Sequence, residues 1–323
     1  MCFDVRMGRQ GVRLAWNDTP DDVRAAIDEI SGSQVVDAVN LDGGFSPGPA
    51  ARCTLADGRV VFVKAAGTEL NPVSPEMHRR EGQVLAGLHE DVPAPQLIGV
   101  FDDGEWVALV IEWIDGVMPV APLSRGDVDR LLGLVERLSC VEGGHALQSC
   151  SDAHPGLFGH WQQLLDQPID SLDAWSSRHL ERLAELEVGV ADAIGGDRLV
   201  HLDFRSDNVI FAAAGPEHDV VVDWPGASVG AGWVDLAGLL PALELDGGPT
   251  PGEVFEHHPV GRAADPDSVS AFVASIAGYF TRMSLMPPPP GLPTLRLFQA
   301  AQGRVARSWI AQRQGWNTVD MNS

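Results

Sequence analysis

The stretch 199–223 carries two carboxylates and an amide at a spacing that suits phosphoryl transfer. Asp203 and Asn208 lie at the two ends of a polar loop, and Asp223 ends the second of two apolar runs that a Gly-Pro turn separates. The two runs predict a β-hairpin, which would bring the three side chains towards one of its ends. One carboxylate could then orient an attacking hydroxyl while the other two groups hold magnesium against nucleotide phosphates. By itself the pattern also fits an ordinary polar turn before a hairpin.

The elements ahead of this stretch predict a sheet with a phosphate-binding loop. Residues 35–41, 50–55 and 60–65 are expected to be strands, with a two-residue hairpin turn at Asp57-Gly58. A glycine-rich loop lies between the first two strands, and its backbone N–H groups could approach phosphates without a Cβ in the way. A plain hairpin turn would explain the same glycines. The loop residues expected to contact a nucleotide are Gly43, Gly44, Phe45 and Ser46.

A lysine, Lys64, lies among apolar residues on the third of these strands. A helix predicted over 75–89 offers an acidic partner, with Glu81 as the first candidate and Glu76 as the second. Such a partner would hold the lysine in place for nucleotide phosphates. The alternative is that both glutamates pair at the surface with neighbouring arginines. Two further strands would complete a five-stranded sheet, at 96–100 and 106–114.

The motif His201-x-Asp203-x4-Asn208, followed by Asp223, resembles the catalytic loop and metal-binding aspartate of the aminoglycoside phosphotransferase family. The order of the other signals agrees, because the glycine loop, the strand lysine and the helix glutamate precede it. The resemblance implies an α+β, protein-kinase-like bilobal fold with a five-stranded antiparallel N-lobe sheet, one main helix and a mostly helical C-lobe. It places the N-terminal lobe at 1–115, with its sheet and helix at 33–111. The hinge would be 112–118 and the helical C-terminal lobe 119–323.

The resemblance also implies a role for each matching residue. Asp203 would be the catalytic base, Asn208 and Asp223 the magnesium ligands, and Arg205 a group that steadies transition-state charge, unless it only pairs with a neighbouring aspartate. His201 is expected to be structural, hydrogen-bonding near the metal-binding aspartate, and not an acid or base. Asp235 matches an aspartate that braces the catalytic loop. The nucleotide would be bound by Lys64, Glu81, the glycine loop and the hinge residues Ile111 (the gatekeeper), Glu112, Trp113 and Ile114.

One position departs from the pattern of the family. Leu202 stands between the histidine and the aspartate, where glycine is usual. The departure puts the local backbone of the loop in question but leaves the chemistry of its side chains unchanged.

The activity that the resemblance implies is an ATP- or GTP-dependent, Mg²⁺-requiring transfer of phosphate to a hydroxyl of a small molecule. Resistance would follow where that molecule is an antibiotic. The acceptor is expected beside Asp203, with residues 140–177, residues 244–267 and the final helix as walls. The alternatives to a small-molecule kinase are a protein kinase and a nucleotide-binding module without catalysis.

Both wall segments are rich in carboxylates, which could bind ammonium groups through charge-assisted hydrogen bonds. They therefore favour an aminoglycoside-like acceptor; the alternatives are a nucleoside antibiotic, a macrolide or a sugar, with the acids only facing water. The carboxylates concerned are Glu142, Asp152, Asp166, Asp170, Asp173, Glu244, Asp246, Glu253, Glu256, Asp265 and Asp267.

The composition of the chain limits which partners it can bind. The formal net charge of −23 argues against nucleic acid or an anionic membrane as a partner. No apolar run reaches the length of a membrane span, and the N-terminus lacks the apolar core of a signal peptide. The four cysteines show no metal-binding spacing, so reduced thiols in a cytoplasmic protein are expected. The protein is expected to be a monomer or a homodimer.

Overall fold

The computed structural model describes residues 13–41, 47–144, 146–289 and 293–318. These residues form two compact units, each of which we treat by itself. The N-terminal unit comprises residues 13–117 and 210–225, and the C-terminal unit comprises 118–209 and 226–318. The glycine-loop residues Gly43, Gly44, Phe45 and Ser46 lie outside the described residues.

A five-stranded sheet forms the centre of the N-terminal unit. Its order is β1-β2-β3-β5-β4, and every neighbouring pair is antiparallel, as predicted. The β2–β3 turn contains Gly58, whose φ of +88° is one that glycine adopts without strain. The strands are β1 (Val35–Asn40), β2 (Ala50–Leu55), β3 (Val60–Gly67), β4 (Leu97–Asp102) and β5 (Trp106–Glu112).

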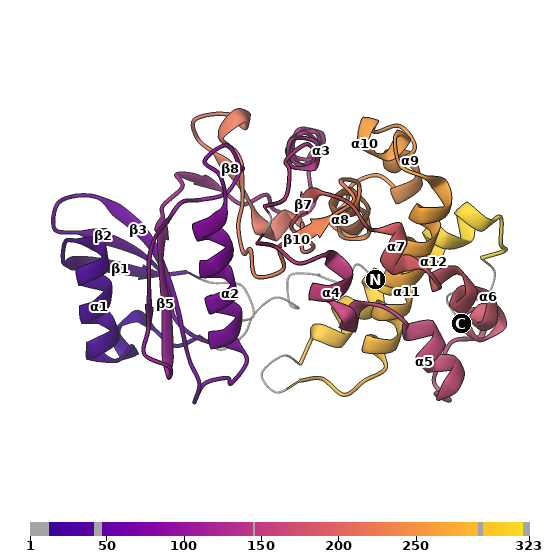
Figure 1. The fold of residues 1–323 in the computed structure, drawn as a ribbon, viewed down its shortest axis with the longest axis horizontal. Coiled ribbons are helices and arrows are strands. Elements are labelled where there is room, and N and C mark those ends of the chain that lie inside the picture. The colour runs from indigo at the N-terminus through magenta and orange to yellow at the C-terminus, as the bar shows by residue number, and fades with distance from the viewer. Residues whose placement is uncertain (1–12, 42–46, 145, 290–292, 319–323) are drawn as a thin grey trace. The chain divides into compact units, whose positions relative to one another are not determined.

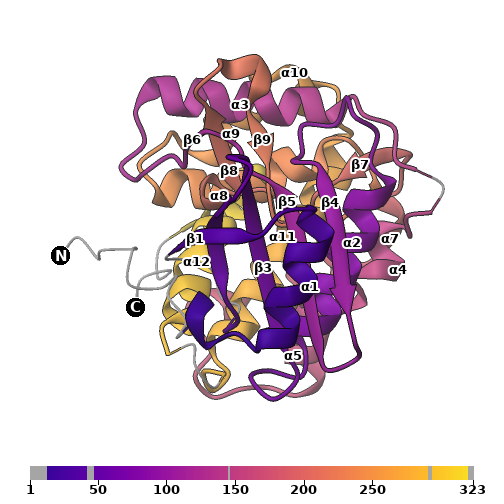
Figure 2. The ribbon, with the colours of Figure 1, turned by 90° about the vertical axis from the view of Figure 1, so that its left-hand side faces the viewer.

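Two helices cover opposite faces of this sheet, α1 (Asp21–Ser31) and α2 (Ser74–Gly87), as Figures 1 and 2 show. A Cβ on Gly99 would lie 2.6 Å from Ile30 of α1, whereas the next residue, Val100, packs against Gly82 of α2. Consecutive residues of a strand point to opposite faces, so the two helices must lie on opposite sides.

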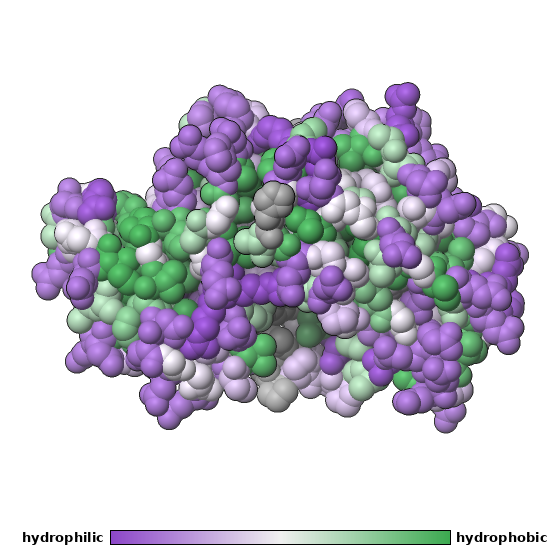
Figure 3. Space-filling view, in the orientation of Figure 1, coloured by the Kyte–Doolittle hydropathy of each residue, from purple (hydrophilic) through white to green (hydrophobic). Residues whose placement is uncertain are grey.

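The apolar core of the unit lies on the α1 face. Val61, Val63 and Ala65 of β3 belong to it together with Val23 and Ile27 of α1. Because side chains alternate along a strand, Lys64 points to the α2 face. Both edge strands carry exposed apolar side chains, Val36 and Val39 on β1 and Ile98 and Val100 on β4. Figure 3 shows apolar surface on the N-terminal unit, at the left of the view.

The start of α1 differs in detail from the pattern expected for its sequence. A threonine followed by proline and two aspartates favours Thr19 as N-cap. Instead Pro20 is the N-cap, and the Thr19 hydroxyl donates to the carbonyl of Ala15. A short 3₁₀ turn, η2 (Trp16–Asp18), precedes the helix, and Thr19 is the C-cap of that turn.

A second, three-stranded sheet in order β6-β8-β9 contains the hairpin of the catalytic stretch. β6 pairs antiparallel with β8, and the 3₁₀ turn η5 (Pro216–His218) connects β8 to β9. The strands are β6 (Gly116–Val117), β8 (Val209–Ala212) and β9 (Val220–Val221).

The C-terminal unit is mostly helical, with one small antiparallel sheet of β7 (Arg198–Val200) and β10 (Ser228–Gly230). Ser124 and Asp127 form a capping box at the start of α3, in agreement with the predicted N-cap. The described helices are α3 (Arg125–Ser139), α4 (Cys150–Ala153), α5 (His160–Asp166), α6 (Ala174–Glu187), α7 (Val190–Ala193), α8 (Val234–Leu245), α9 (Pro251–Phe255), α10 (Pro259–Arg262), α11 (Pro266–Ser284) and α12 (Leu295–Gln314), with the 3₁₀ turns η3 (Pro155–Leu157) and η4 (Ser206–Asn208).

The two segments expected to be loop-rich are more regular than their sequences indicate. Residues 140–177 contain α4, α5 and the start of α6, and residues 244–267 contain α9 and α10. The helix expected at 179–194 is in fact α6 followed by α7, interrupted at Gly189, whose φ is +81°. Within the described part of the chain, no helix is both long and apolar enough to span a bilayer.

Candidate active site

Lys64 lies between two carboxylates of the N-terminal unit. Its ammonium forms an ion pair with Glu81 of α2 and donates to Oδ1 of Asp223 at 2.8 Å. Lys64 and Glu81 are both largely buried. The ion pair predicted between them is therefore present, and Asp223, from the far end of the catalytic stretch, joins it.

The charges of this triad follow from its surroundings. Burial by itself would lower the pKa of Lys64, but the carboxylates of Asp223 and Glu81 outweigh burial and raise that pKa. Burial raises the pKa of Glu81, and the lysine partly offsets the increase. Lys64 is consequently held as an ammonium on the α2 face of the sheet.

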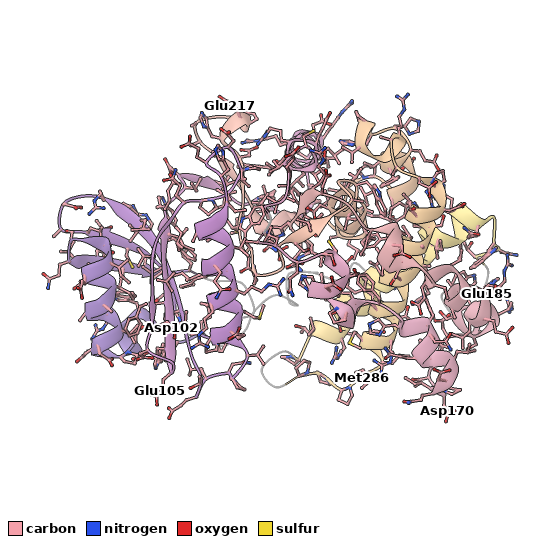
Figure 4. All side chains as sticks on the ribbon, in the orientation of Figure 1. Asp102, Glu105, Asp170, Glu185, Glu217 and Met286 are labelled. Atoms are coloured by element: carbon pink, nitrogen blue, oxygen red, sulfur yellow. The ribbon has the colours of Figure 1, made fainter. Side chains whose placement is uncertain are left out.

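The second candidate partner, Glu76, is not part of the triad. Its carboxylate lies 3.4 Å from Arg79, which also donates to Asp102 at the end of β4 (Figure 4). Glu76 and Glu81 differ by five residues, which turns them to different sides of α2. Because of the direction in which each residue points from α2, Glu81 and not Glu76 is the partner of Lys64.

Sequence reasoning missed a buried histidine one turn before Glu81. Met77 is 48% exposed, whereas the polar His78 beside it is buried. Burial, aided by the charge of Lys64, lowers the pKa of His78 to about 3, so its imidazole is neutral. Its spacing of three from Glu81 was the signal that could have indicated a shared helix face.

Asp235 fixes the backbone at the start of the catalytic loop in the C-terminal unit. Its buried carboxylate accepts the backbone N–H groups of His201 at 2.7 Å and Leu202 at 2.8 Å. Leu202 has a φ of +68°, in the left-handed region that glycine adopts freely. The loop therefore keeps a backbone suited to glycine although leucine occupies the position.

The carboxylate of Asp203 is held at both oxygens. Arg205 donates to Oδ1 at 2.6 Å, and the Asn208 amide donates to Oδ2 at 3.0 Å and to the Asp203 carbonyl at 2.9 Å. Arg205 also donates through Nε to Asp207 at 2.9 Å. The predicted pairing of Arg205 with Asp207 is present, and the same guanidinium fixes Asp203.

His201 and Phe204 support the loop from within. Both are buried, and Nδ1 of His201 accepts the backbone N–H of Asp203 at 3.3 Å. A histidine whose ring nitrogen is engaged with the loop backbone helps to position the aspartate.

The segment predicted to contact the base follows β5. Ile111 is buried within the strand, and the backbone N–H of Glu112 donates to the carbonyl of Gln96 at 2.9 Å. The guanidinium of Arg52 lies 5.4 Å from the centre of the Trp113 ring. Ile114 lies outside any strand.

Asn208 in the C-terminal unit and Asp223 in the N-terminal unit each carry an oxygen of the kind that binds magnesium. Because the amide nitrogen of Asn208 is directed at Asp203, its carbonyl oxygen is directed elsewhere. Carboxylate and amide oxygens are the ligands that Mg²⁺ accepts. Across the described ranges, histidine, cysteine, aspartate and glutamate do not gather in groups of three that could hold a metal ion by themselves.

Several carboxylates expected to line an acceptor pocket instead complete helix starts. Asp173 caps α6, Asp265 caps α11, and Glu253 closes the capping box of α9. Asp152 accepts the hydroxyl of Ser149 at the start of α4. Buried Asp246 accepts the hydroxyl of Ser206 in the catalytic loop. These five acids act within the fold.

The fold and these two clusters define a kinase-like phosphotransferase, and comparisons with known proteins agree. The structure resembles an aminoglycoside-3'-phosphotransferase of type VIII, with a TM-score of 0.52 and 20% identity over 80% of this chain and 98% of the other. It also resembles a thermostable mutant of the aminoglycoside phosphotransferase APH(4)-Ia in complex with ADP and hygromycin B, with a TM-score of 0.57 and 15% identity over 92% and 100% of the two chains.

A choline/ethanolamine kinase family protein from Mesorhizobium loti has the same fold, with a TM-score of 0.53 and 16% identity over 91% of this chain and 93% of the other. A search of curated proteins gives no match. The model of the APH family, described as the phosphotransferase enzyme family, matches residues 38–272. The chain belongs to this family, as the resemblance of its catalytic stretch predicted.

Proposed function

We propose that this protein transfers the terminal phosphate of ATP or GTP to a hydroxyl of a small molecule. The observation that carries the proposal is the fixed carboxylate of Asp203, which Arg205 and Asn208 hold at separate oxygens. A carboxylate fixed in this way can accept a proton from a hydroxyl in one defined orientation.

The chemistry follows the general course of phosphoryl transfer. The acceptor hydroxyl gives its proton to Asp203 while its oxygen forms a bond to the terminal phosphorus. The bond between that phosphorus and the bridging oxygen breaks, and the nucleoside diphosphate leaves. Arg205 keeps Asp203 in place and contributes positive charge near the phosphate being transferred.

The nucleotide is proposed to be bound mainly by the N-terminal unit. Lys64, held by Glu81, would contact its α- and β-phosphates, and the backbones of Gly43, Gly44, Phe45 and Ser46 would approach the phosphates. The base would meet the carbonyl of Glu112 and the N–H of Ile114, beside Ile111 and Trp113. Mg²⁺ held by Asn208 and Asp223 would neutralise phosphate charge. Support comes from the Lys64 pairs and from the ADP in the APH(4)-Ia complex.

The acceptor is proposed to be an antibiotic or a similar hydroxylated compound. An aminoglycoside is one candidate, since two of the similar structures are aminoglycoside phosphotransferases. The other candidates are a nucleoside, a macrolide or a sugar. They are supported by the five acids that were expected in the pocket but that hydrogen-bond within the fold. A protein kinase is less favoured, because the Ala-Pro-Glu segment is missing and the path from Asp223 to Asp235 is short.

Two variants test the proposal. Asp203→Asn should lower kcat roughly 100- to 10,000-fold and leave nucleotide affinity nearly unchanged, since it removes proton acceptance and no phosphate contact. Asp223→Asn should instead abolish the metal-dependent part of nucleotide binding. The matched control is Asp197→Asn, an acid with 80% of its side chain exposed in the same unit as Asp203. Turnover in Asp203→Asn equal to that of the control would refute the assignment.

A further inference from the structure

The surroundings of Asp203 in the C-terminal unit include an aromatic and cationic group of side chains from α11 and α12. We call Tyr279, Arg296, Phe298 and Gln299 the α11–α12 wall. Arg205, which holds Asp203 at 2.6 Å, lies with its guanidinium 5.7 Å from the centre of the Phe298 ring. The first turn of α12 is thereby next to the catalytic loop.

Gln299, the residue after Phe298, connects the other members of the wall to it. Gln299 accepts a hydrogen bond from Nη1 of Arg296 at 2.7 Å and is hydrogen-bonded to the phenol of Tyr279. Burial raises the pKa of that phenol, and the charge of Asp203 raises it further. Tyr279 and Phe298 are both partly exposed.

The apolar surface continues along α11. Met283 lies one turn after Tyr279, and Met286, labelled in Figure 4, follows just beyond the end of the helix. The spacing of four residues puts Met283 on the side of α11 that carries Tyr279. Met286 is 37% exposed and Met283 is partly exposed.

The charge of the wall is positive. Arg296 donates through Nε and Nη2 to the carbonyl of Pro287 and through Nη1 to Gln299, and among the described residues it has no carboxylate partner. In the same unit, Asp170 beyond α5 and Glu185 of α6 lie at the periphery in Figure 4, away from the start of α12. The four residues that define the wall include no acid.

We propose that the acceptor binds on the α11–α12 wall through a flat aromatic or otherwise apolar part, and that it is not a polycation. This inference rests on the proposed kinase activity and names the substrate class of that site. A ring can stack on or meet the edge of Phe298 and Tyr279, and the methionines can adapt to its outline. The unneutralised guanidinium of Arg296 repels ammonium groups that approach Asp203.

A matched pair of acceptors isolates the aromatic part. p-Nitrophenyl β-D-glucopyranoside and methyl β-D-glucopyranoside offer the same hydroxyls, and only the first carries a ring. The aryl glycoside should bind about tenfold more tightly, measured as Kd by ligand-observed NMR with the full-length protein and as KM where turnover occurs. Kanamycin provides the polycation, and its binding should be the weakest of the three.

Two variants on α12 locate the contact. Phe298→Leu should weaken binding of the aryl glycoside roughly fivefold and change that of the methyl glycoside less than about twofold. The control is the neighbouring Leu297→Ala, whose side chain is 63% exposed. Arg296→Gln should strengthen kanamycin binding several-fold, since it removes one positive charge and keeps a polar side chain. A general loss of structure would change both glucosides equally.

The outcomes separate this inference from the proposed function. Equal affinity for the two glucosides, or kanamycin binding tighter than either, would overturn this inference. If kanamycin were phosphorylated in an Asp203-dependent manner, the proposed kinase activity would still stand. A failure of the protein to bind nucleotide in an Asp223-dependent manner would refute the proposed function instead. A higher affinity for the aryl glycoside that Phe298→Leu removes would support the wall.

Discussion

Replacing Asp235 by asparagine should disturb the catalytic loop through its backbone. The Asp235 carboxylate accepts two N–H groups, at 2.7 Å from His201 and 2.8 Å from Leu202. Asparagine offers one acceptor oxygen and turns an NH₂ group towards the second donor. One backbone N–H would then lose its partner in a place where Asp235 is 5% exposed.

The magnitude can be worked out from two contributions. A buried donor without a partner costs about 1–3 kcal/mol. Leu202 holds a left-handed backbone conformation that costs roughly 1–2 kcal/mol, and it can escape once its N–H is released. Relief of that strain offsets part of the lost hydrogen bond, so we expect the free energy of unfolding to fall by about 1–2 kcal/mol and Tm to fall by roughly 2–5 °C. A shift of about 1 Å in Asp203 would lower kcat on the order of 100-fold.

The assay combines thermal unfolding with steady-state transfer in four proteins: wild type, Asp235→Asn, Leu202→Gly and the double variant. Glycine tolerates the left-handed conformation, so Leu202→Gly should keep wild-type kcat and should recover part of the activity lost in Asp235→Asn. If Asp235→Asn had the Tm and kcat of the wild type, the bracing role would be wrong. If the double variant were no better than Asp235→Asn, the backbone strain at Leu202 would not be the cause of the loss.

Three further predictions concern other parts of the molecule. Lys64→Met should weaken nucleotide binding at least tenfold in a fluorescence titration, whereas Glu81→Gln should weaken it less because the lysine keeps its charge; equal affinity in all three proteins would contradict the role of the ion pair. Gly48→Ala should destabilise the protein by more than about 3 kcal/mol in urea unfolding, because a Cβ would lie 1.8 Å from the carbonyl oxygen of Ala65; a fully stable variant would disprove that close approach. Burial raises the pKa of Glu187 from 4.5 to about 7, so the folded protein holds a proton that the unfolded chain releases. The stability from this group should be complete below about pH 4.5 and lost as the pH rises to about 7, so urea unfolding should show wild type losing about 1–3 kcal/mol relative to Glu187→Gln across that range; parallel pH profiles would argue against it.

Local patterns along the chain predicted most of the N-terminal unit. The five strands and the Asp57-Gly58 turn follow from alternation and turn chemistry, which depend on near neighbours. The helix between 75 and 89 also followed from its pattern, but its buried face did not. Met77 is exposed and His78 is buried, because packing against the sheet fixes the phase of α2 within a sequence that has few apolar residues.

The acids of the C-terminal unit show where sequence reasoning reached its limit. Carboxylates in 140–177 and 244–267 predicted a pocket for a cation, since acids in loops usually face ligand or water. Short helices that the sequence did not indicate use Asp152 and Glu253 at their starts, and a longer helix begins at Asp265. Whether an aspartate is a ligand or a cap depends on where a helix begins, which weakly periodic segments do not reveal.

By itself, the sequence determined the family and named the candidate reacting groups, because the spacing His201-x-Asp203-x4-Asn208 and the later Asp223 are properties of the chain alone. Tertiary structure decided which of these groups touch. Lys64 and Asp223 are 159 residues apart and meet at 2.8 Å because the hairpin after the catalytic loop packs in the same unit as the first sheet. Tertiary structure also decided the backbone at Leu202, since only the carboxylate of Asp235, brought in by α8, holds a leucine in a conformation suited to glycine.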